Sequence, residues 1–219
     1  MKRTVGILGG MGPEATVALM ARVIAAVDAA DDADHIPLLV DQNPQVPSRI
    51  ARLIEGRGED PAPVLAMMAR RLEGAGACAL AMPCNTAHAY ADVIRAAVTI
   101  PFLDMVQASA AALAAGPVVL MASPAVRRAG VFEGALAGRE VIHPDADRAL
   151  ALIRAVKRDG ATPENRAAFA ALVQATGDAQ VLVACTEFSL LAEPGPQVID
   201  TLDVLVREIV AFSTGETHG

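Results

Sequence analysis

The chain has 219 residues, of which 53% are hydrophobic and 20% are charged, and its formal net charge at pH 7 is -7. This composition predicts a globular chain and excludes a disordered one. The acidic charge, with a single Tyr and no Trp, argues against nucleic-acid binding, which needs a basic surface. The apolar runs fall far short of the ~20 residues of a membrane-spanning helix. The first residues do not follow a signal-peptide pattern, so we expect no membrane association and a cytoplasmic location.

Short runs rich in Val, Ile and Leu alternate along the chain with longer Ala-rich segments of helical periodicity. This alternation is typical of βαβ units around a parallel sheet. The runs predict strands at residues 4–8, 36–40, 77–82 and 100–103 in the first half, and at 117–121, 140–142, 180–184 and 197–199 in the second. Helices are expected at residues 14–29, 61–73, 86–97, 104–115, 125–137, 146–159, 163–176 and 202–212.

Both halves place four strands in the same order, which we interpret as an internal duplication of a four-stranded α/β unit. The last predicted helix has no strand after it, so we expect it to return to the first unit. The predicted domains are therefore residues 1–103 plus 202–219, and residues 104–201. The segment 42–61 breaks the pattern because it is long for a strand-to-helix connection. Long loops are often functional, although a solvated excursion is an equally simple interpretation.

Two cysteines occupy matching contexts, since Cys84 and Cys185 each follow the third predicted strand of their half. Each precedes residues that favour a helix start, so both thiols should emerge at the strand edge where parallel α/β folds bind ligands. A helix N-terminus can lower a thiol pKa, which would make one cysteine a base and the other an acid. The alternative is that each is a buried strand-end residue. Cys78 is expected to be a small core residue, and all three cysteines are expected to be free.

Other kinds of site are weakly indicated. The segment Gly9-Gly10-Met11-Gly12 lies at the first strand-to-helix turn but lacks the spacing of a dinucleotide-binding loop. No metal site is expected, because the histidines are scattered, at His35, His88, His143 and His218.

Several motifs together resemble the aspartate/glutamate racemase family of cofactor-independent amino-acid racemases, and most closely its aspartate racemase branch. The resemblance spans nearly the whole chain and rests on the segments 6–16, 43–49, 58–61, 82–88, 184–187 and 199–200. The most specific of these are Cys84-Asn85-Thr86-Ala87-His88 and the later Cys185-Thr186-Glu187. The resemblance implies two α/β domains related by a pseudo-two-fold axis, an active site at their interface, no cofactor and a homodimer.

The same resemblance implies roles for individual residues. Cys84 and Cys185 correspond to the two catalytic cysteines, and Arg49 to the arginine that binds a substrate carboxylate. The remaining residues expected to bind substrate are Met11, Asn85, Thr86, Ser123, Lys157, Thr186 and Glu187. Lys157 matches a second cationic group of the family, with a solvated helix position as the alternative.

Two departures from the family pattern bear on the substrate. Ser123 is the one hydroxyl in a turn that is usually rich in threonine, and Ser48 stands where an aspartate is common. The sequence thus predicts a racemase that interconverts L- and D-aspartate, or glutamate, without pyridoxal phosphate. The alternatives are a racemase of a non-acidic amino acid and a non-catalytic protein that binds metabolites or senses redox state through its thiols.

Overall fold

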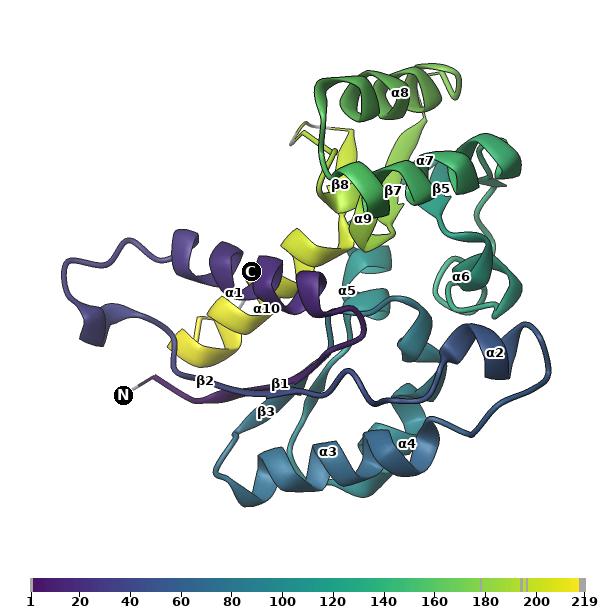
Figure 1. The fold of residues 1–219 in the computed structure, drawn as a ribbon. Coiled ribbons are helices and arrows are strands. Elements are labelled where there is room, and N and C mark those ends of the chain that lie inside the picture. Colours follow the sequence, from purple (N-terminus) through teal and green to yellow (C-terminus); the bar gives the residue numbers. More distant parts are fainter. Residues whose placement is uncertain (1, 178, 194, 196, 217–219) are drawn as a thin grey trace.

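The structure is a computed structural model that describes residues 2–177, 179–193, 195 and 197–216. Within these residues the chain forms two four-stranded sheets flanked by helices, and the strands of each sheet pair in parallel. Figure 1 shows the two sheets as separate parts of one molecule, each with its own helices. The predicted α/β fold of two similar halves is confirmed. The predicted domain limits at Met1 and Gly219, and also His218, lie outside the described residues.

The two sheets share one topology. The first has the order β2-β1-β3-β4, built from β1 (Val5–Gly9), β2 (Leu38–Gln42), β3 (Ala79–Ala81) and β4 (Phe102–Leu103). The second has the order β6-β5-β7-β8, built from β5 (Val118–Ala122), β6 (Val141–Ile142), β7 (Gln180–Ala184) and β8 (Val198–Asp200). Strands β3 and β7, which precede the two cysteines, therefore occupy corresponding interior positions.

The helices follow the strands in the order that the duplication predicts. They are α1 (Pro13–Ala25), α2 (Arg49–Leu53), α3 (Ala62–Gly74), α4 (Ala91–Ala97), α5 (Met105–Ala111), α6 (Pro124–Arg128), α7 (Ala146–Asp159), α8 (Pro163–Gln174), α9 (Thr186–Ser189) and α10 (Thr201–Thr214). Two short 3₁₀ helices cover Asp32–Asp34 and Thr86–Tyr90. No helix of the described residues is both long enough and apolar enough to span a membrane.

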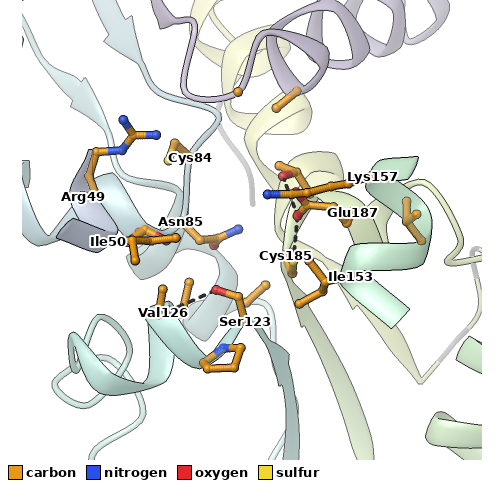
Figure 2. A pocket seen from close by; sticks show the side chains of 18 of the residues that line it. Arg49, Ile50, Cys84, Asn85, Ser123, Val126, Ile153, Lys157, Cys185 and Glu187 are labelled. Carbon is orange, nitrogen blue, oxygen red and sulfur yellow. Dashed lines mark hydrogen bonds and ion pairs between the residues drawn. The ribbon is translucent and has the colours of Figure 1, made fainter. Parts of the chain in front are cut away.

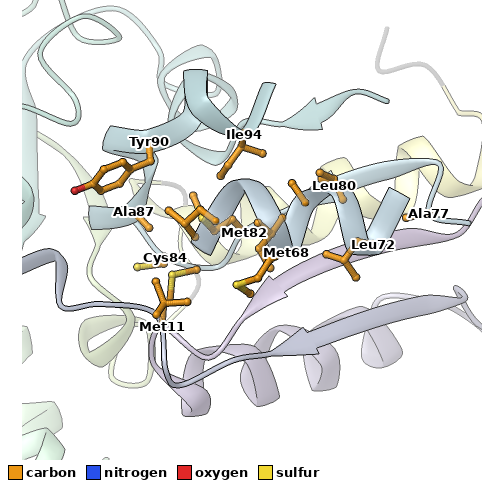
Figure 3. Close-up of a cluster of buried hydrophobic side chains, with 14 residues drawn as sticks. Met11, Met68, Leu72, Ala77, Leu80, Met82, Cys84, Ala87, Tyr90 and Ile94 are labelled. Carbon is orange, nitrogen blue, oxygen red and sulfur yellow. The ribbon is translucent and has the colours of Figure 1, made fainter. Parts of the chain in front are cut away.

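Each sheet is buried on both faces, as its nearly continuous apolar strands require. In the first half, α3 and α4 pack on one face, and Figure 3 shows this cluster around Met68, Leu80 and Ile94. On the other face, α1 and α10 pack against β1, where Leu19 and Leu205 are fully buried. Helix α10 thus packs on the first sheet although it follows β8 of the second. This position agrees with the proposed domain division, whose exact limits stay a prediction.

Two local predictions were wrong. The helix expected at 125–137 ends at Arg128, because Gly130 adopts a φ of 64° and a series of turns follows. Those turns still bury Phe132 and Leu136, so the apolar spacing that suggested a helix serves packing instead. Cys78 is exposed rather than buried, because it lies just before β3 and alternates with the buried Ala77 and Ala79.

We predict that Gly10→Ala destabilises the protein more than Gly76→Ala. Both glycines have a positive φ, of 91° and 99°, which strains any other residue. Only at Gly10 would the added Cβ also meet backbone, 2.4 Å from the Asn43 carbonyl carbon, whereas Gly76 faces open space.

Chemical denaturation should show a free energy of unfolding for Gly10→Ala that is lower by at least about 1 kcal/mol than that of Gly76→Ala. Equal losses would show that the contact with Asn43 does not constrain this turn.

Candidate active site

The carboxyl ends of strands from both sheets border a cavity of about 990 Å³. All ten residues predicted for the site line this cavity, including Met11 after β1 and Ser123 after β5. Figure 2 shows Cys84 and Arg49 on one side of it and Cys185, Lys157 and Glu187 on the other. The fold therefore brings the predicted residues together, while their individual roles stay predictions.

Cys84 is a buried thiol that follows β3 by three residues. Its carbonyl oxygen accepts a hydrogen bond from Nδ1 of the buried His88, at 2.9 Å, which fixes the backbone of this turn. Burial raises the pKa of Cys84, and the positive charge and hydrogen bond of Arg49 act in the opposite direction. Glu187, from the other half of the chain, raises this pKa further, so its charge reaches across the cavity.

Cys185 is the buried residue that immediately precedes α9, and its surroundings are anionic. Its Sγ donates a hydrogen bond to Oε2 of Glu187, at 3.0 Å. Burial and the charge of Glu187 together raise the pKa of Cys185 well above its ordinary value. Burial acts to raise the pKa of Glu187 too, but hydrogen bonds from Cys185 and the backbone, with the charge of Lys157, outweigh it and lower that pKa. The Lys157 ammonium lies 3.3 Å from Oε1 of Glu187.

The N–H groups at the two helix starts act to lower the thiol pKa values, as the sequence suggested, but burial outweighs them and both pKa values are raised. A 3₁₀ helix of five residues follows Cys84, and α9 after Cys185 has four residues. Such short helices offer a few N–H groups rather than a long aligned dipole, and desolvation of the buried thiols exceeds their effect. The expected capping is also missing: Asn85 occupies the N-cap position without a side-chain cap, and Thr186 is the first residue of α9 rather than its N-cap.

The long segment after β2 contains α2, a helix that the sequence did not predict. Ser48 caps it by accepting a hydrogen bond from the Ala51 N–H, and Arg49 is its first residue. Nη1 of Arg49 donates to the carbonyl oxygens of Val46 and Pro47, at 3.3 and 3.1 Å. Its Nε is buried and has no hydrogen-bond partner among the described residues, which leaves one donor for a ligand. Because this segment follows β2, it lies at the same end of the first sheet as Cys84, and Arg49 lines the same cavity as that thiol.

Two further predicted residues, Asn85 and Ser123, have structural contacts of their own. Nδ2 of Asn85 donates to Oγ1 of Thr201, at 3.2 Å, and so joins the turn after β3 to the start of α10. Ser123 caps α6 by accepting from the Val126 N–H, at 3.3 Å. Thr86 and Thr186 are the first residues of the helices that follow the two cysteines.

Sequence reasoning missed an ionic cluster beside the site. Arg22 of α1 contacts the carboxylates of Asp200 and Asp203, each at 2.7 Å, and donates to the carbonyl oxygen of Ser189, also at 2.7 Å. The Ser189 hydroxyl donates in turn to Asp200. This cluster ties the first half to α9, directly behind Cys185. Two features of the sequence could have indicated a role for Asp200: the segment Ile199-Asp200 resembles the family, and it lies at the end of the eighth strand.

An apolar part of the lining was also missed. Ile50 of α2, Val126 of α6 and Ile153 of α7 line the cavity together with the predicted polar residues. Figure 2 shows these three side chains below Arg49 and Lys157 in that view. We call Ile50, Val126 and Ile153 the apolar wall. Among the described residues, no group of three or more His, Cys, Asp or Glu side chains is arranged to hold a metal ion.

Comparisons with known proteins agree with this geometry. A family described as Asp/Glu/Hydantoin racemase matches residues 8–209. The broad specificity amino-acid racemase RacX of Bacillus subtilis is 28% identical over 212 residues, which cover 91% of this chain and 92% of that protein.

Two solved structures show the same fold. The aspartate racemase of Picrophilus torridus superposes with a TM-score of 0.86 at 28% identity, covering 97% of this chain and 94% of that one. The glutamate racemase of Francisella tularensis, solved with D-glutamate, superposes with a TM-score of 0.64 at 16% identity, covering 99% and 84%.

We predict that Glu187→Gln makes Cys185 more reactive. The substitution keeps the size of the side chain but removes the anion beside the thiol, so the pKa of Cys185 should fall. A fall of one unit gives about tenfold more thiolate at neutral pH, and alkylation by iodoacetamide should accelerate accordingly.

Peptide mapping by mass spectrometry separates the three cysteines in one reaction. The exposed Cys78 serves as the internal reference for the reagent. Cys84 should change less than Cys185, because Glu187 is a minor influence on it. An unchanged rate at Cys185 would contradict the assigned role of the carboxylate.

Proposed function

Because the chain belongs to the Asp/Glu/hydantoin racemase family, and is thus an isomerase of the racemase type, we propose that it inverts α-amino acids with Cys84 and Cys185 as its two bases. One observation carries the proposal. Two buried thiols from corresponding positions of a duplicated fold line opposite sides of the same cavity. A planar carbanion between them can receive a proton on either face, which is what inversion requires.

The proposed reaction moves two protons. The thiolate of one cysteine removes the proton from Cα, so the electron pair of the C–H bond stays on carbon and the thiolate becomes a thiol. The thiol of the second cysteine then donates its proton to the opposite face and becomes a thiolate. The reverse reaction begins from this state with the roles exchanged, so no oxidant, reductant or cofactor is consumed.

The surroundings of the thiols distinguish their resting states. Cys84 lies beside the Arg49 guanidinium, which favours its thiolate, whereas Cys185 donates a hydrogen bond to the Glu187 carboxylate and is held as the thiol. We propose that Cys84 is the base and Cys185 the acid in the resting enzyme. The ion pair between Glu187 and Lys157 keeps the acceptor ionised and in place.

We propose that polar side chains next to Cys84 bind the α-carboxylate and α-ammonium groups of the substrate. Arg49 lines the cavity next to Asn85 and Thr86, and its Nε has no hydrogen-bond partner among the described residues, so its guanidinium is proposed to hold the α-carboxylate. Holding that carboxylate on a cation lowers the energy of the carbanion formed beside it. Oxygen Oδ1 of Asn85 is also buried without a hydrogen-bond partner in the described structure, so it can accept from the α-ammonium group.

The names of the relatives differ on the substrate. The Picrophilus protein is an aspartate racemase, in line with the acidic substrate that the sequence predicted, while the Bacillus protein has broad specificity. We therefore propose an amino-acid racemase without restricting it to aspartate and glutamate. The homodimer and the cytoplasmic location also stay predictions, and light scattering on the purified protein tests the first.

We predict that Cys84→Ala and Cys185→Ala each abolish inversion. A two-base mechanism needs both faces served, so each variant should lose roughly 10²–10⁴-fold in kcat. The assay incubates enzyme and amino acid in D2O without added cofactor, follows the α-proton by NMR and resolves the enantiomers by chiral chromatography.

Cys78→Ala is the matched control, because this thiol is exposed and lies outside the cavity. It should keep wild-type rates. Near wild-type inversion in either active-site variant would refute the two-base assignment. Absence of deuterium incorporation by the wild-type protein with every amino acid would favour the non-catalytic alternative.

We predict that Arg49→Lys impairs turnover although the charge is kept. A lysine ammonium cannot reproduce the guanidinium, which contacts two backbone carbonyls through Nη1 and keeps further N–H donors for a carboxylate. The loss should exceed about tenfold in kcat/KM, with Arg49→Ala still lower. Arg52→Lys, one turn further along the same helix and outside the cavity lining, is the control. Unchanged kinetics in both Arg49 variants would remove this residue from the site.

A further inference from the structure

The charges around the cavity are balanced before any substrate arrives. Three cationic side chains and three acidic ones of the described residues line it. They are Arg49, Arg128 and Lys157, and Glu14, Asp147 and Glu187. A neutral amino acid enters as a zwitterion with no net charge, whereas aspartate or glutamate brings one additional negative charge. The lining thus contains no surplus of positive charge to receive a second carboxylate.

The cation expected for a second carboxylate is already engaged. Lys157 pairs with Glu187 at 3.3 Å, and Glu187 also accepts the hydrogen bond of Cys185. A substrate carboxylate on Lys157 would compete with the group that keeps Cys185 protonated. The hydroxyl of Ser123 already accepts the capping hydrogen bond of α6, so it offers the substrate one neutral donor. These contacts argue against a preformed binding site for the carboxylate of an acidic substrate side chain.

The apolar wall offers a different kind of contact. Val126 and Ile153 are buried, with exposed fractions of 2% and 6%, while Ile50 is 50% exposed although it lines the cavity. Helices α2 and α6, which carry Ile50 and Val126, contact each other across the two halves of the chain. The wall is therefore continuous between the domains, and one large apolar side chain is left partly uncovered at the site.

We propose that the substrate is a neutral α-amino acid with an extended apolar side chain, which packs on Ile50, Val126 and Ile153. This inference rests on the proposed racemase function and names its substrate class. The α-carboxylate is held at Arg49, and the side chain runs toward the apolar wall rather than toward Lys157. Each methylene that leaves water against the wall raises the affinity for substrate and transition state, by about fourfold in kcat/KM when it is fully buried.

A homologous series of substrates tests the inference. Inversion in D2O is measured for alanine, 2-aminobutyrate, norvaline and norleucine, with aspartate and glutamate alongside. We expect kcat/KM to rise along the neutral series and norleucine to exceed both acidic substrates by at least tenfold. A higher kcat/KM for aspartate or glutamate than for norleucine, or a flat neutral series, would overturn the substrate assignment while leaving the racemase proposal intact. Absence of inversion with all six would overturn both.

Two isoleucine variants locate the effect. Ile50→Ala should lower kcat/KM for norleucine at least fivefold more than for alanine, because it removes the exposed part of the wall. Ile24→Ala is the matched control, since Ile24 is a similarly exposed isoleucine, at 55%, on α1 and outside the cavity lining. Equal effects of Ile50→Ala on norleucine and alanine would show that the side chain binds elsewhere.

Discussion

The Asp200 carboxylate joins the two halves of this molecule, and the geometry of the cavity depends on it. Asp200 ends β8 of the second sheet and caps α10, which packs on the first sheet. It also accepts hydrogen bonds from Arg22 of α1 and from Ser189 of α9. Burial raises the pKa of this carboxyl, and its bonds to Arg22, Ser189 and the Leu202 N–H oppose that change. A buried carboxylate of this kind is tolerated because Arg22, the Ser189 hydroxyl and the Leu202 N–H donate hydrogen bonds to it.

That junction determines where the second thiol lies. Ser189 binds Asp200 through its hydroxyl and Arg22 through its carbonyl oxygen, and its N–H donates to the carbonyl oxygen of Cys185. On the other side, Asn85 beside Cys84 bonds to Thr201, the residue after Asp200. The backbones next to both cysteines are therefore fixed to the same junction, which sets the separation of the two walls of the cavity.

Burial and nearby charges give two chemically identical side chains different tendencies to ionise. Both thiols lose hydration, which favours the neutral form of each. An adjacent guanidinium offsets part of this loss at Cys84, whose pKa is still raised, while an adjacent carboxylate adds to it at Cys185. A fold duplicated in its backbone is thus asymmetric in its electrostatics, because an arginine acts on one thiol and a glutamate is hydrogen-bonded to the other. In the proposed mechanism, this asymmetry lets one thiol accept a proton while the other donates one.

The sequence by itself determined the architecture and the membership of the site. Apolar runs separated by amphipathic segments specify buried parallel strands, and the parallel strands of one sheet end at the same edge, so Ser123 and Cys185 share an edge of the second sheet. That this edge faces Cys84 of the first sheet was implied by the family resemblance. Local signals were weaker where tertiary contacts compete with propensity. The segment after Arg128 turns instead of forming a helix because packing of Phe132 and Leu136 and the conformation of Gly130 prevail over its Ala-rich composition.

Only the tertiary structure decided the pKa directions and the contacts across the two halves. Desolvation depends on how deeply Cys84 and Cys185 are buried, and no local pattern encodes that depth. The pairing of Arg22 with Asp200 and the contact between α2 and α6, which carry Ile50 and Val126, join residues of the two halves. Such contacts depend on how the two sheets are placed relative to each other. Helix α10, which follows the last strand of the second sheet, packs on the first sheet and helps to set this placement. Sequence periodicity describes each sheet separately, and for this reason it could not show them.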